Sequence, residues 1–483
     1  MRTTVILAAL LAAPALAQPV ALDADLEPWL GDFDGMLERR MVRVLVPYSR
    51  TLFFNDKGAQ RGLTADALKD LEAFLNRKHK LKNRQITVVA VPTTRDRLLP
   101  ALVEGRGDIA AGNLTITAER GKLVDFSEPV FTGVSEIVVT GPASPPLAAL
   151  DDLAGQEVHV RRASTYYASL SALNQKFLSQ KKAAMRLTLV PDALEDEDLM
   201  DMLAAGLVKL AAVDDWKASL WSGMVPKLKP RPDLALTSGE NVGWAFRKGS
   251  PKLAAEVNHY IRTHPGAAAK RFKNYPRYLK QLRNATADAD WKRFESTLAL
   301  FKKYGARYQF DYLMLAAQGY QESRLNQEAR SHVGAIGIMQ VMPDTGAEMR
   351  VGDITQADPN VHAGAKYMRR LYQRHFDDAG MDEQNRTLLA IAAYNAGPGR
   401  VAALRAEAAK KGLDPNVWFN NVELIAARRV GQETVSYVRN IYKYYIAYKL
   451  QLETLEARRA ALPPQPAQPA AKAPKAAKAA KAK

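Results

Sequence analysis

The pattern of apolar residues changes once along this 483-residue chain, near residue 276, and the change divides it into two parts. Before it, strand-like runs at residues 41–47, 85–91 and 210–213 alternate with stretches of helical periodicity. Such alternation favours an α/β domain with a mainly parallel sheet. From residue 291 to 450, long helical stretches predominate and β-branched runs are few. We therefore predict an α/β domain followed by a mainly α-helical domain.

The first residues contain the three parts of an export signal. Arg2 supplies a positive charge, residues 5–13 form a short apolar run, and Ala15-Leu16-Ala17 fits a small-residue cleavage site. We predict a signal peptide over residues 1–17, with an alanine-rich helix of the fold as the alternative. No later stretch reaches the roughly 18 consecutive apolar residues that a membrane-spanning helix needs. The expected location is the periplasm, with at most peripheral association with a membrane such as the outer membrane.

Charge and cysteine content narrow the choice of partners. The net charge of +17 predicts a surface that attracts anions, and five lysines lie in the low-complexity tail, residues 463–483, which we expect to be disordered. An exported protein rarely meets nucleic acid, so anionic cell-wall polymers or lipid surfaces are the better candidates and no nucleic-acid partner is predicted. The absence of cysteine excludes disulfides, thiolate metal ligands and a lipidated N-terminal cysteine.

Four short patterns follow one another in the helical part. They are Tyr-Gln-Glu-Ser at residues 320–323, Gly-Ala-Ile-Gly-Ile-Met-Gln at 334–340, Ala-Tyr-Asn-Ala-Gly at 393–397, and Glu-Thr-Val-Ser-Tyr-Val at 433–438. The two glycines of the second pattern allow a tight backbone turn that can lie along a sugar. The tyrosine and asparagine of the third supply a ring and an amide, which suit acetamido sugars. Together these patterns indicate a carbohydrate-binding cleft.

Glu322 is the candidate catalytic group. Leu315, Gly319 and Glu322 are spaced so that they share one face of a helix that begins near Asp311. A glutamate on an inward-packing face is expected to be partly desolvated, which raises its pKa and suits a proton donor near neutral pH. The alternative is a glutamate at a helix end that points into solvent.

In order and spacing, these patterns resemble the catalytic domain of soluble lytic transglycosylases, over residues 294–450. The resemblance implies a lysozyme-like fold with Glu322 as catalytic acid and base. It implies a sugar-binding cleft lined by other residues of the four patterns and of the loop beside them, namely Ser323, Ser331, Gln340, Met342, Tyr394, Asn395, Glu433 and Tyr437.

The implied reaction cleaves the β-1,4 bond between N-acetylmuramic acid and N-acetylglucosamine in the glycan strands of peptidoglycan, and it forms a 1,6-anhydro sugar without water. Ordinary glycosidases use two carboxylates, but Glu328 and Asp344 are in no pattern that suggests a partner role. A muramidase that hydrolyses the same bond remains an alternative. The seven histidines show no paired ligand spacing, so neither a metal nor another cofactor is expected.

The α/β part carries a second resemblance, to bacterial solute-binding proteins of family 3, over residues 40–275. It rests on the run from Asp108 to Arg120 and on Val-Asp-Phe-Ser-Glu-Pro at residues 124–129. The resemblance implies a two-lobed periplasmic-binding-protein-like domain with an amino-acid or muropeptide ligand between the lobes. Asn113 and Ser164 depart from the family pattern, which usually has a small residue and a glycine there. The implied ligand contacts are Thr115 and Arg120 for a carboxylate, Ser164 and Thr165 as further donors, Asp214 for an amino group, and Tyr48 as an aromatic wall.

The two domains in this order behind an export signal resemble the membrane-bound lytic transglycosylases. The resemblance implies an enzyme regulated by a ligand at its N-terminal domain. A non-catalytic solute-binding or sensor protein with a wall-binding module is the alternative from another functional class.

Overall fold

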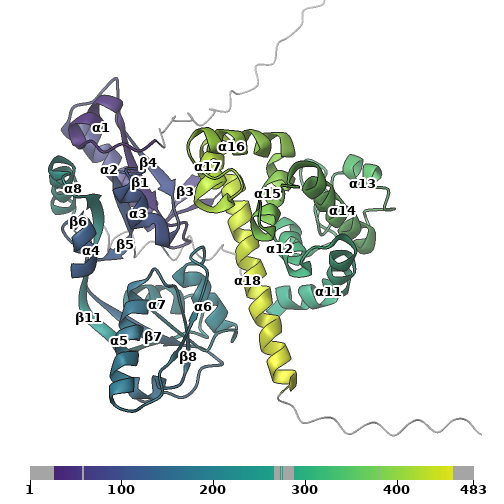
Figure 1. Ribbon diagram of the computed structural model, residues 1–483, viewed down its shortest axis with the longest axis horizontal. Coiled ribbons are helices and arrows are strands. Elements are labelled where there is room, and N and C mark those ends of the chain that lie inside the picture. The colour runs from purple at the N-terminus through teal and green to yellow at the C-terminus, as the bar shows by residue number, and fades with distance from the viewer. Residues whose placement is uncertain are drawn as a thin grey trace, which may run out of the picture.

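The computed structural model describes residues 27–56, 59–265, 288–378 and 380–460, together with Phe272 and Tyr275. The predicted signal peptide and the basic tail lie outside these residues, as does most of the predicted boundary between the domains. Figure 1 shows a two-lobed α/β domain beside a helical domain. The predicted fold class is therefore confirmed. Within the described residues, no helix is long and apolar enough to cross a membrane.

One large mixed sheet runs through both lobes of the N-terminal domain. Its strand order is β4-β1-β5-β11-β7-β10-β8-β9, and β6 pairs with β11 beside this path. A separate hairpin is formed by β2 and β3. The strands are β1 (Met41–Val46), β2 (Phe54–Asp56), β3 (Ala59–Arg61), β4 (Thr87–Pro92), β5 (Ile109–Thr115), β6 (Val124–Phe126), β7 (Phe131–Thr140), β8 (Glu157–Val160), β9 (Arg186–Leu189), β10 (Leu210–Asp214) and β11 (Lys229–Arg247).

The sheet is parallel only within each lobe. The pairs β1–β4, β1–β5, β10–β8 and β8–β9 are parallel, whereas β7 and β11 pair antiparallel with their neighbours. The expectation of a mainly parallel sheet is therefore correct for the lobes and wrong for their junction. Strand β11 belongs to both lobes: its first residues pair with the end of β7, and its last residues pair with β5 and β6. The pairing of β11 with β7 is irregular between Arg231 and Val242, where the strand passes from one lobe to the other.

Helices cover the sheet in each lobe and bury separate apolar clusters. In the first lobe, Leu71 and Phe246 are fully buried; in the second, Leu170, Phe177 and Leu210 are. The helical segments are α1 (Phe33–Arg39), α2 (Leu63–Lys78), η1 (Arg95–Arg97), α3 (Leu98–Val103), α4 (Ala118–Leu123), η2 (Leu150–Leu153), α5 (Thr165–Ser179), α6 (Asp196–Ala204), α7 (Asp215–Ser222) and α8 (Pro251–Thr263).

The helical domain is built around an apolar cluster that includes Phe301, Leu388 and Ile441, all fully buried. Its segments are α11 (Asp288–Tyr308), α12 (Tyr312–Ser323), α13 (Pro343–Met349), α14 (Ala357–His375), α15 (Glu383–Ala396), α16 (Pro398–Lys410), η3 (Trp418–Val422), α17 (Glu423–Arg429) and α18 (Gln432–Ala460). The helix predicted to begin near Asp311 is α12, and the Asp311 side chain caps it by accepting a hydrogen bond from the Leu313 backbone N–H at 2.9 Å.

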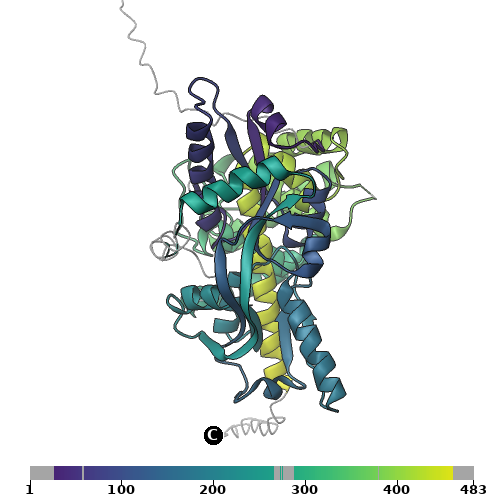
Figure 2. The same cartoon turned by 90° about the vertical axis from the view of Figure 1, so that its left-hand side faces the viewer.

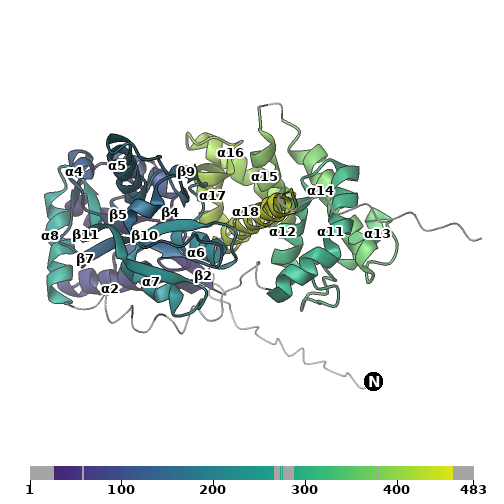
Figure 3. The ribbon, with the colours of Figure 1, turned by 90° about the horizontal axis from the view of Figure 1, so that it is seen from below.

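Helix α18 is 29 residues long and lies between the two domains (Figures 1 and 3). Figure 2 shows it running behind both lobes of the N-terminal domain. On the first lobe, the Tyr48 hydroxyl donates a hydrogen bond to the Ser436 hydroxyl of α18. On the second lobe, the Asp198 carboxylate lies 3.4 Å from the Lys443 ammonium of α18. The same helix therefore contacts both lobes.

A buried ion pair anchors the first lobe at the start of β5. The carboxylate of Asp108 is fully buried and lies 3.0 Å from the guanidinium of Arg43, which is also fully buried. It accepts a second hydrogen bond, at 2.7 Å, from the Arg43 backbone N–H. The guanidinium of Arg39 is a further partner of the same carboxylate. Removing this charge leaves buried cations without a counter-ion, which is costly.

We predict that Asp108→Asn lowers the free energy of unfolding by about 3–5 kcal/mol, the usual cost of breaking a buried pair. Glu119→Gln is the control, because Glu119 pairs with Lys122 on the exposed surface of α4 and such pairs contribute little. Urea denaturation followed by far-ultraviolet circular dichroism measures both. Equal midpoints for the two variants would show that Asp108 is not a structural anchor.

Candidate active site and ligand cleft

Glu322 lies in the last turn of α12, and this helix is packed closely on its inner side. At Gly319, one turn earlier, an added Cβ would lie 3.1 Å from both Phe301 and Ile338. Leu315, two turns before Glu322, is buried. The apolar face predicted from the sequence therefore does pack inward, and Glu322 stands where that face ends.

The carboxyl group of Glu322 is half-buried, and one of its oxygens is held by a tyrosine. The hydroxyl of Tyr437, on α18, donates a hydrogen bond to Oε1 of Glu322. Burial raises the pKa of Glu322 to about 7, and the Tyr437 hydrogen bond opposes that shift. No second carboxylate of the described residues contributes to the shift. Glu322 is therefore protonated in a substantial fraction of molecules near neutral pH.

Three side chains hold the backbone of the loop at residues 334–340 beside Glu322. The Ser323 hydroxyl donates to the Ile338 carbonyl at 2.9 Å, and the Tyr394 hydroxyl donates to the Met339 carbonyl at 2.8 Å. The amide of Asn360, which is fully buried, donates to the Ile336 carbonyl at 2.8 Å and accepts from the Met339 N–H at 2.9 Å. The hydroxyls of Ser323 and Tyr394 therefore position the loop beside Glu322.

One glycine of this loop is required by its surroundings. Gly337 has a φ of +76°, and an added Cβ would lie 2.6 Å from both the Asn360 and the Gln327 amide nitrogens. A larger residue would therefore displace the loop. In the same loop the Gln340 amide donates to the Gly337 carbonyl at 2.9 Å, and the Ser331 hydroxyl accepts from the Ala335 N–H at 2.9 Å.

Three further residues predicted to bind sugar, Asn395, Glu433 and Met342, are exposed to solvent. Asn395, exposed at the end of α15, accepts a hydrogen bond at 2.8 Å from the Thr434 hydroxyl, which ties this helix to the start of α18. Glu433 is also exposed. Met342, which precedes α13, is 42% exposed and presents an apolar side chain to solvent.

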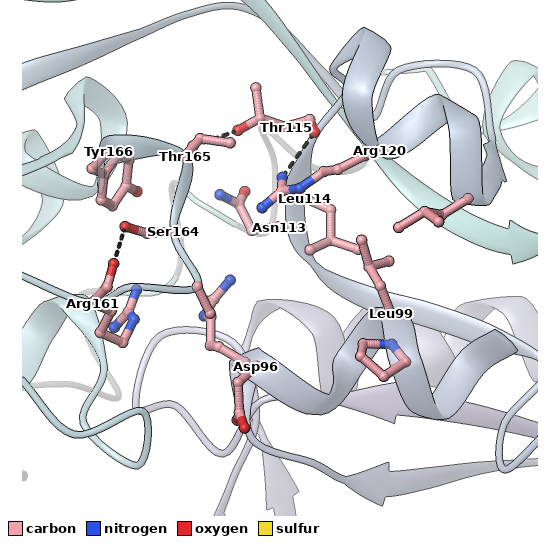
Figure 4. A pocket seen from close by; sticks show the side chains of 14 residues that line it. Asp96, Leu99, Asn113, Leu114, Thr115, Arg120, Arg161, Ser164, Thr165 and Tyr166 are labelled. Carbon is pink, nitrogen blue, oxygen red and sulfur yellow. Dashed lines mark hydrogen bonds between the residues drawn. The ribbon is translucent and has the colours of Figure 1, made fainter. Parts of the chain in front are cut away.

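A cavity of about 230 Å³ lies between the two lobes of the N-terminal domain (Figure 4). Thr115 and Arg120 line it from the first lobe, and Ser164 and Thr165 line it from the start of α5 in the second. The hydroxyls of Thr115 and Thr165 are 3.4 Å apart across the cavity. Four of the six residues predicted to bind a ligand are thus brought together.

The other two residues predicted for this site do not line the cavity. Tyr48 lies at the contact with α18 that is described above. Asp214 is buried at the end of β10, where its carboxylate accepts a hydrogen bond from the Asn113 amide at 2.7 Å and lies 3.2 Å from the Lys217 ammonium.

Buried ion pairs join the two lobes beside the cavity. The guanidinium of Arg95, in the first lobe, lies 2.8 Å from the carboxylate of Glu195 in the second. The guanidinium of Arg50 lies 3.1 Å from Asp198 and 2.6 Å from Asp201, both on α6. The structure therefore has the lobes in contact, with charged side chains of α6 facing arginines of the first lobe.

Neither site contains a cluster suited to a metal. In the part of the chain that the structure describes, no three His, Asp or Glu side chains come together as metal ligands would. The chemistry available to the site at Glu322 is therefore that of one carboxyl group with a raised pKa, a tyrosine hydroxyl and the polar groups of the bordering loop.

Two protein families match this chain. Residues 42–266 match the bacterial extracellular solute-binding proteins of family 3, and residues 299–416 match the Transglycosylase SLT domain. The chain combines a family 3 solute-binding domain with a transglycosylase SLT domain. These two matches confirm the predicted families and the predicted class of enzyme, a peptidoglycan lytic transglycosylase.

Relatives align with this chain over most of their length. The chain is 29% identical to the membrane-bound lytic murein transglycosylase F of Desulfosudis oleivorans, over 72% of this chain and 79% of that protein. It is 26% identical to the protein of that name from Pseudomonas fluorescens, over 84% of each chain. Among solved structures, a substrate-binding protein of an amino-acid ABC transporter from Streptococcus pneumoniae, bound to L-arginine, aligns with 52% of this chain and all of that one, at 17% identity and a TM-score of 0.42.

Two residues near these sites were missed from the sequence. Asn360 of the SLT domain holds the loop beside Glu322, but it lies about twenty residues beyond that loop and in none of the four patterns. Lys217 of the solute-binding domain neutralises Asp214, which lies three positions before it in the sequence, at the start of α7. A lysine at that position is usually a solvated surface residue, so only the tertiary structure reveals its partner.

We predict that Glu322→Gln stabilises the SLT domain above neutral pH. Because the pKa of Glu322 is raised from 4.5 to about 7, the folded protein binds an extra proton between these values and loses stability as the pH rises through them. At about pH 8 the variant should therefore be more stable than the wild type by roughly 1–3 kcal/mol. The difference should vanish near pH 4.

Thermal melts at both pH values measure this effect. Glu328→Gln is the matched control, because Glu328 is exposed on the nearby loop and its removal should leave the melting temperature unchanged at either pH. Equal melting temperatures of wild type and Glu322→Gln at about pH 8 would contradict the burial of this charge.

Proposed function

We propose that this protein cleaves the β-1,4 bond between N-acetylmuramic acid and N-acetylglucosamine in peptidoglycan and leaves a 1,6-anhydro end on the muramic acid. The observation that carries this proposal is the raised pKa of Glu322, about 7, without a second carboxylate that contributes to it. A single carboxyl group that is protonated near neutral pH can donate a proton, and once ionised it can accept one. This pair of steps is what a transglycosylase without a second carboxylate requires.

In the proposed reaction, Glu322 first acts as an acid. Its Oε1 is held by Tyr437, which leaves Oε2 to carry the proton to the glycosidic oxygen. As the bond from this oxygen to the anomeric carbon breaks, the positive charge on that carbon is met by the acetamido oxygen of the same sugar. The N-acetylglucosamine portion leaves as an alcohol.

Glu322 then acts as a base. Its carboxylate removes the proton from the C6 hydroxyl of the muramic acid, and the C6 oxygen forms a new bond to the anomeric carbon. The acetamido oxygen is released, and Glu322 is protonated again for the next cycle. The Tyr437 hydroxyl supports the ionised form of Glu322 between the two steps.

We also propose that the protein works outside the cytoplasm, in the periplasm, where peptidoglycan is present. The export signal at residues 1–17 supports this location. The net charge of +17 favours association with anionic surfaces such as the cell wall.

The N-terminal cleft is proposed to bind a ligand that regulates the SLT domain. Helix α18 supports this coupling, because Tyr437 contacts Glu322 and its neighbour Ser436 contacts Tyr48 of the first lobe. The second lobe reaches the same helix through Asp198 and Lys443. A ligand that changes the angle between the lobes must therefore change contacts on the helix that carries Tyr437.

The test of the proposed reaction is mass spectrometry of purified peptidoglycan after digestion by the mature protein, in parallel with Glu322→Gln. Muropeptides with 1,6-anhydro ends from the wild type alone are the expected result. Reducing ends would instead identify a muramidase that uses water. No products from either protein would favour a binding protein without catalytic activity.

A second prediction concerns Tyr437→Phe. The Tyr437 hydrogen bond lowers the pKa of Glu322, so its loss should raise that pKa above 7. The falling limb of kcat/KM against pH should therefore move to higher pH, while the rate at neutral pH decreases because the ionised form loses its support. A limb that stays in place would mean that another group controls the alkaline decline.

A further inference from the structure

The acid that should hold the amino group of a ligand in the N-terminal domain is already neutralised within the protein. The carboxylate of Asp214 is buried, with the Lys217 ammonium 3.2 Å away and the Asn113 amide donating to it at 2.7 Å. The ammonium of Lys217 also lies 2.5 Å from Asp196 and 3.3 Å from the Tyr166 hydroxyl. Asp214 therefore has no free charge to offer a second ammonium group.

Lys217 remains charged in this position. Burial alone would lower its pKa, but the carboxylates of Asp196 and Asp214 outweigh burial and raise it. A ligand ammonium placed here would have to displace a buried cation that has two carboxylate partners. It would also meet the nearby guanidinium of Arg161, which pairs with Asp196.

Arg120, in contrast, has no directly paired carboxylate among the described residues. Its guanidinium lines the cavity and donates to the Thr115 carbonyl at 2.9 Å, and it makes no ion pair with any carboxylate of the described residues. Burial lowers its pKa and the charge of Arg95 lowers it further, whereas the carboxylates of Glu136 and Asp214 act to raise it. Figure 4 shows Arg120 on the first-lobe side of the cavity, facing the start of α5. A half-buried cation of this kind favours an anionic ligand.

Two further polar atoms of cavity-lining residues have no hydrogen-bond partner in the part of the chain that the structure describes. They are the Nε of Arg161 and the Oδ1 of Asn113, both buried. The amide of Asn113 cannot be turned over, because the Asp214 carboxylate only accepts hydrogen bonds and must face its nitrogen. The Oδ1 atom is therefore an acceptor left for a neutral N–H or O–H donor of a ligand.

We propose that this cavity binds a small carboxylate whose adjacent nitrogen is acylated, and that it discriminates against the free α-amino acid. The ligand carboxylate pairs with Arg120, and the amide N–H next to it donates to Oδ1 of Asn113. The cavity volume of about 230 Å³ suits a single acylated residue. This inference rests on the proposed ligand role of the cleft and narrows its chemistry.

Isothermal titration calorimetry on the full mature chain tests the proposal with matched pairs: alanine, glutamine and glutamate, each free and N-acetylated. We expect at least one N-acetyl derivative to bind about 10-fold or more tightly than its free amino acid, a difference of about 1.4 kcal/mol. Arg120→Gln should weaken that binding by about 10-fold or more. Lys122→Gln is the matched control, because Lys122 is exposed on the same helix and does not line the cavity, so it should bind like the wild type.

The variant Lys217→Met should reverse the preference for N-acetylated ligands. It frees Asp214 for a ligand ammonium, so the free amino acids should gain affinity relative to their N-acetyl forms. A thermal melt shows whether this variant folds; if it does not, the wild-type pairs and Arg120→Gln still decide the question.

Tighter binding of the free amino acids to the wild type would overturn the inference. So would binding of the N-acetyl derivatives that does not depend on Arg120. Either result would leave the proposed regulatory role of the cleft in place. Binding of none of the six compounds would overturn the inference together with that role. Digestion of peptidoglycan by the same preparation reports separately on the proposed reaction at Glu322.

Discussion

Helix α18 is the element on which the arrangement of the whole molecule depends, because it packs against three parts of the chain at once. Its Tyr437 holds the carboxyl group of Glu322 on α12, its Ser436 meets Tyr48 of the first lobe, and its Lys443 meets Asp198 of the second. Arg439 adds a buried ion pair with Glu423, itself fully buried, which fixes the helix to α17. The position of Tyr437 relative to Glu322 is therefore determined by the same helix that both lobes contact.

Both domains bury charged groups, but Glu322 has no oppositely charged partner among the described residues, whereas most buried charges of the N-terminal domain are in ion pairs. At Glu322 a carboxyl group is withdrawn from water with only a hydroxyl as partner, so its proton is retained to about pH 7. In the N-terminal domain most buried charges are paired with opposite charges, as at Arg43 with Asp108 and Arg95 with Glu195. Arg120 of that domain is half-buried, lines the cavity and has no such ion pair among the described residues.

Much of this architecture can be predicted from sequence because local patterns report local structure. The strands β1, β4 and β10 are apolar runs, and their predicted positions agree with the structure within about two residues. Strand β7 was not predicted. The first half of β11 contains prolines, charges and glycine, and it pairs irregularly with β7 as it passes between the lobes. Its extended shape comes from pairing with a distant strand, which no local pattern reports.

The same distinction holds for the sites. Glu322 was found because its helix has an apolar face, and the burial of that face follows from spacing alone. The loop beside it was found from its glycines, but Asn360, which holds that loop, comes from another helix. Lys217 pairs with Asp214 and Asp196, and these pairs join β10 and α6 to the start of α7. Only when these pairs are known is it clear that the Asp214 carboxylate is neutralised and unavailable to a ligand.

The ion pairs between the lobes also bear on time. Opening of the lobes would separate Arg95 from Glu195 and the hydroxyl of Thr115 from that of Thr165. A ligand that enters only the open form would therefore bind at the rate at which the lobes open, and not at the rate of diffusional encounter. Such a ligand would also leave only when the lobes open. The N-terminal domain would then respond slowly and average the supply of its ligand over the lifetime of the closed state.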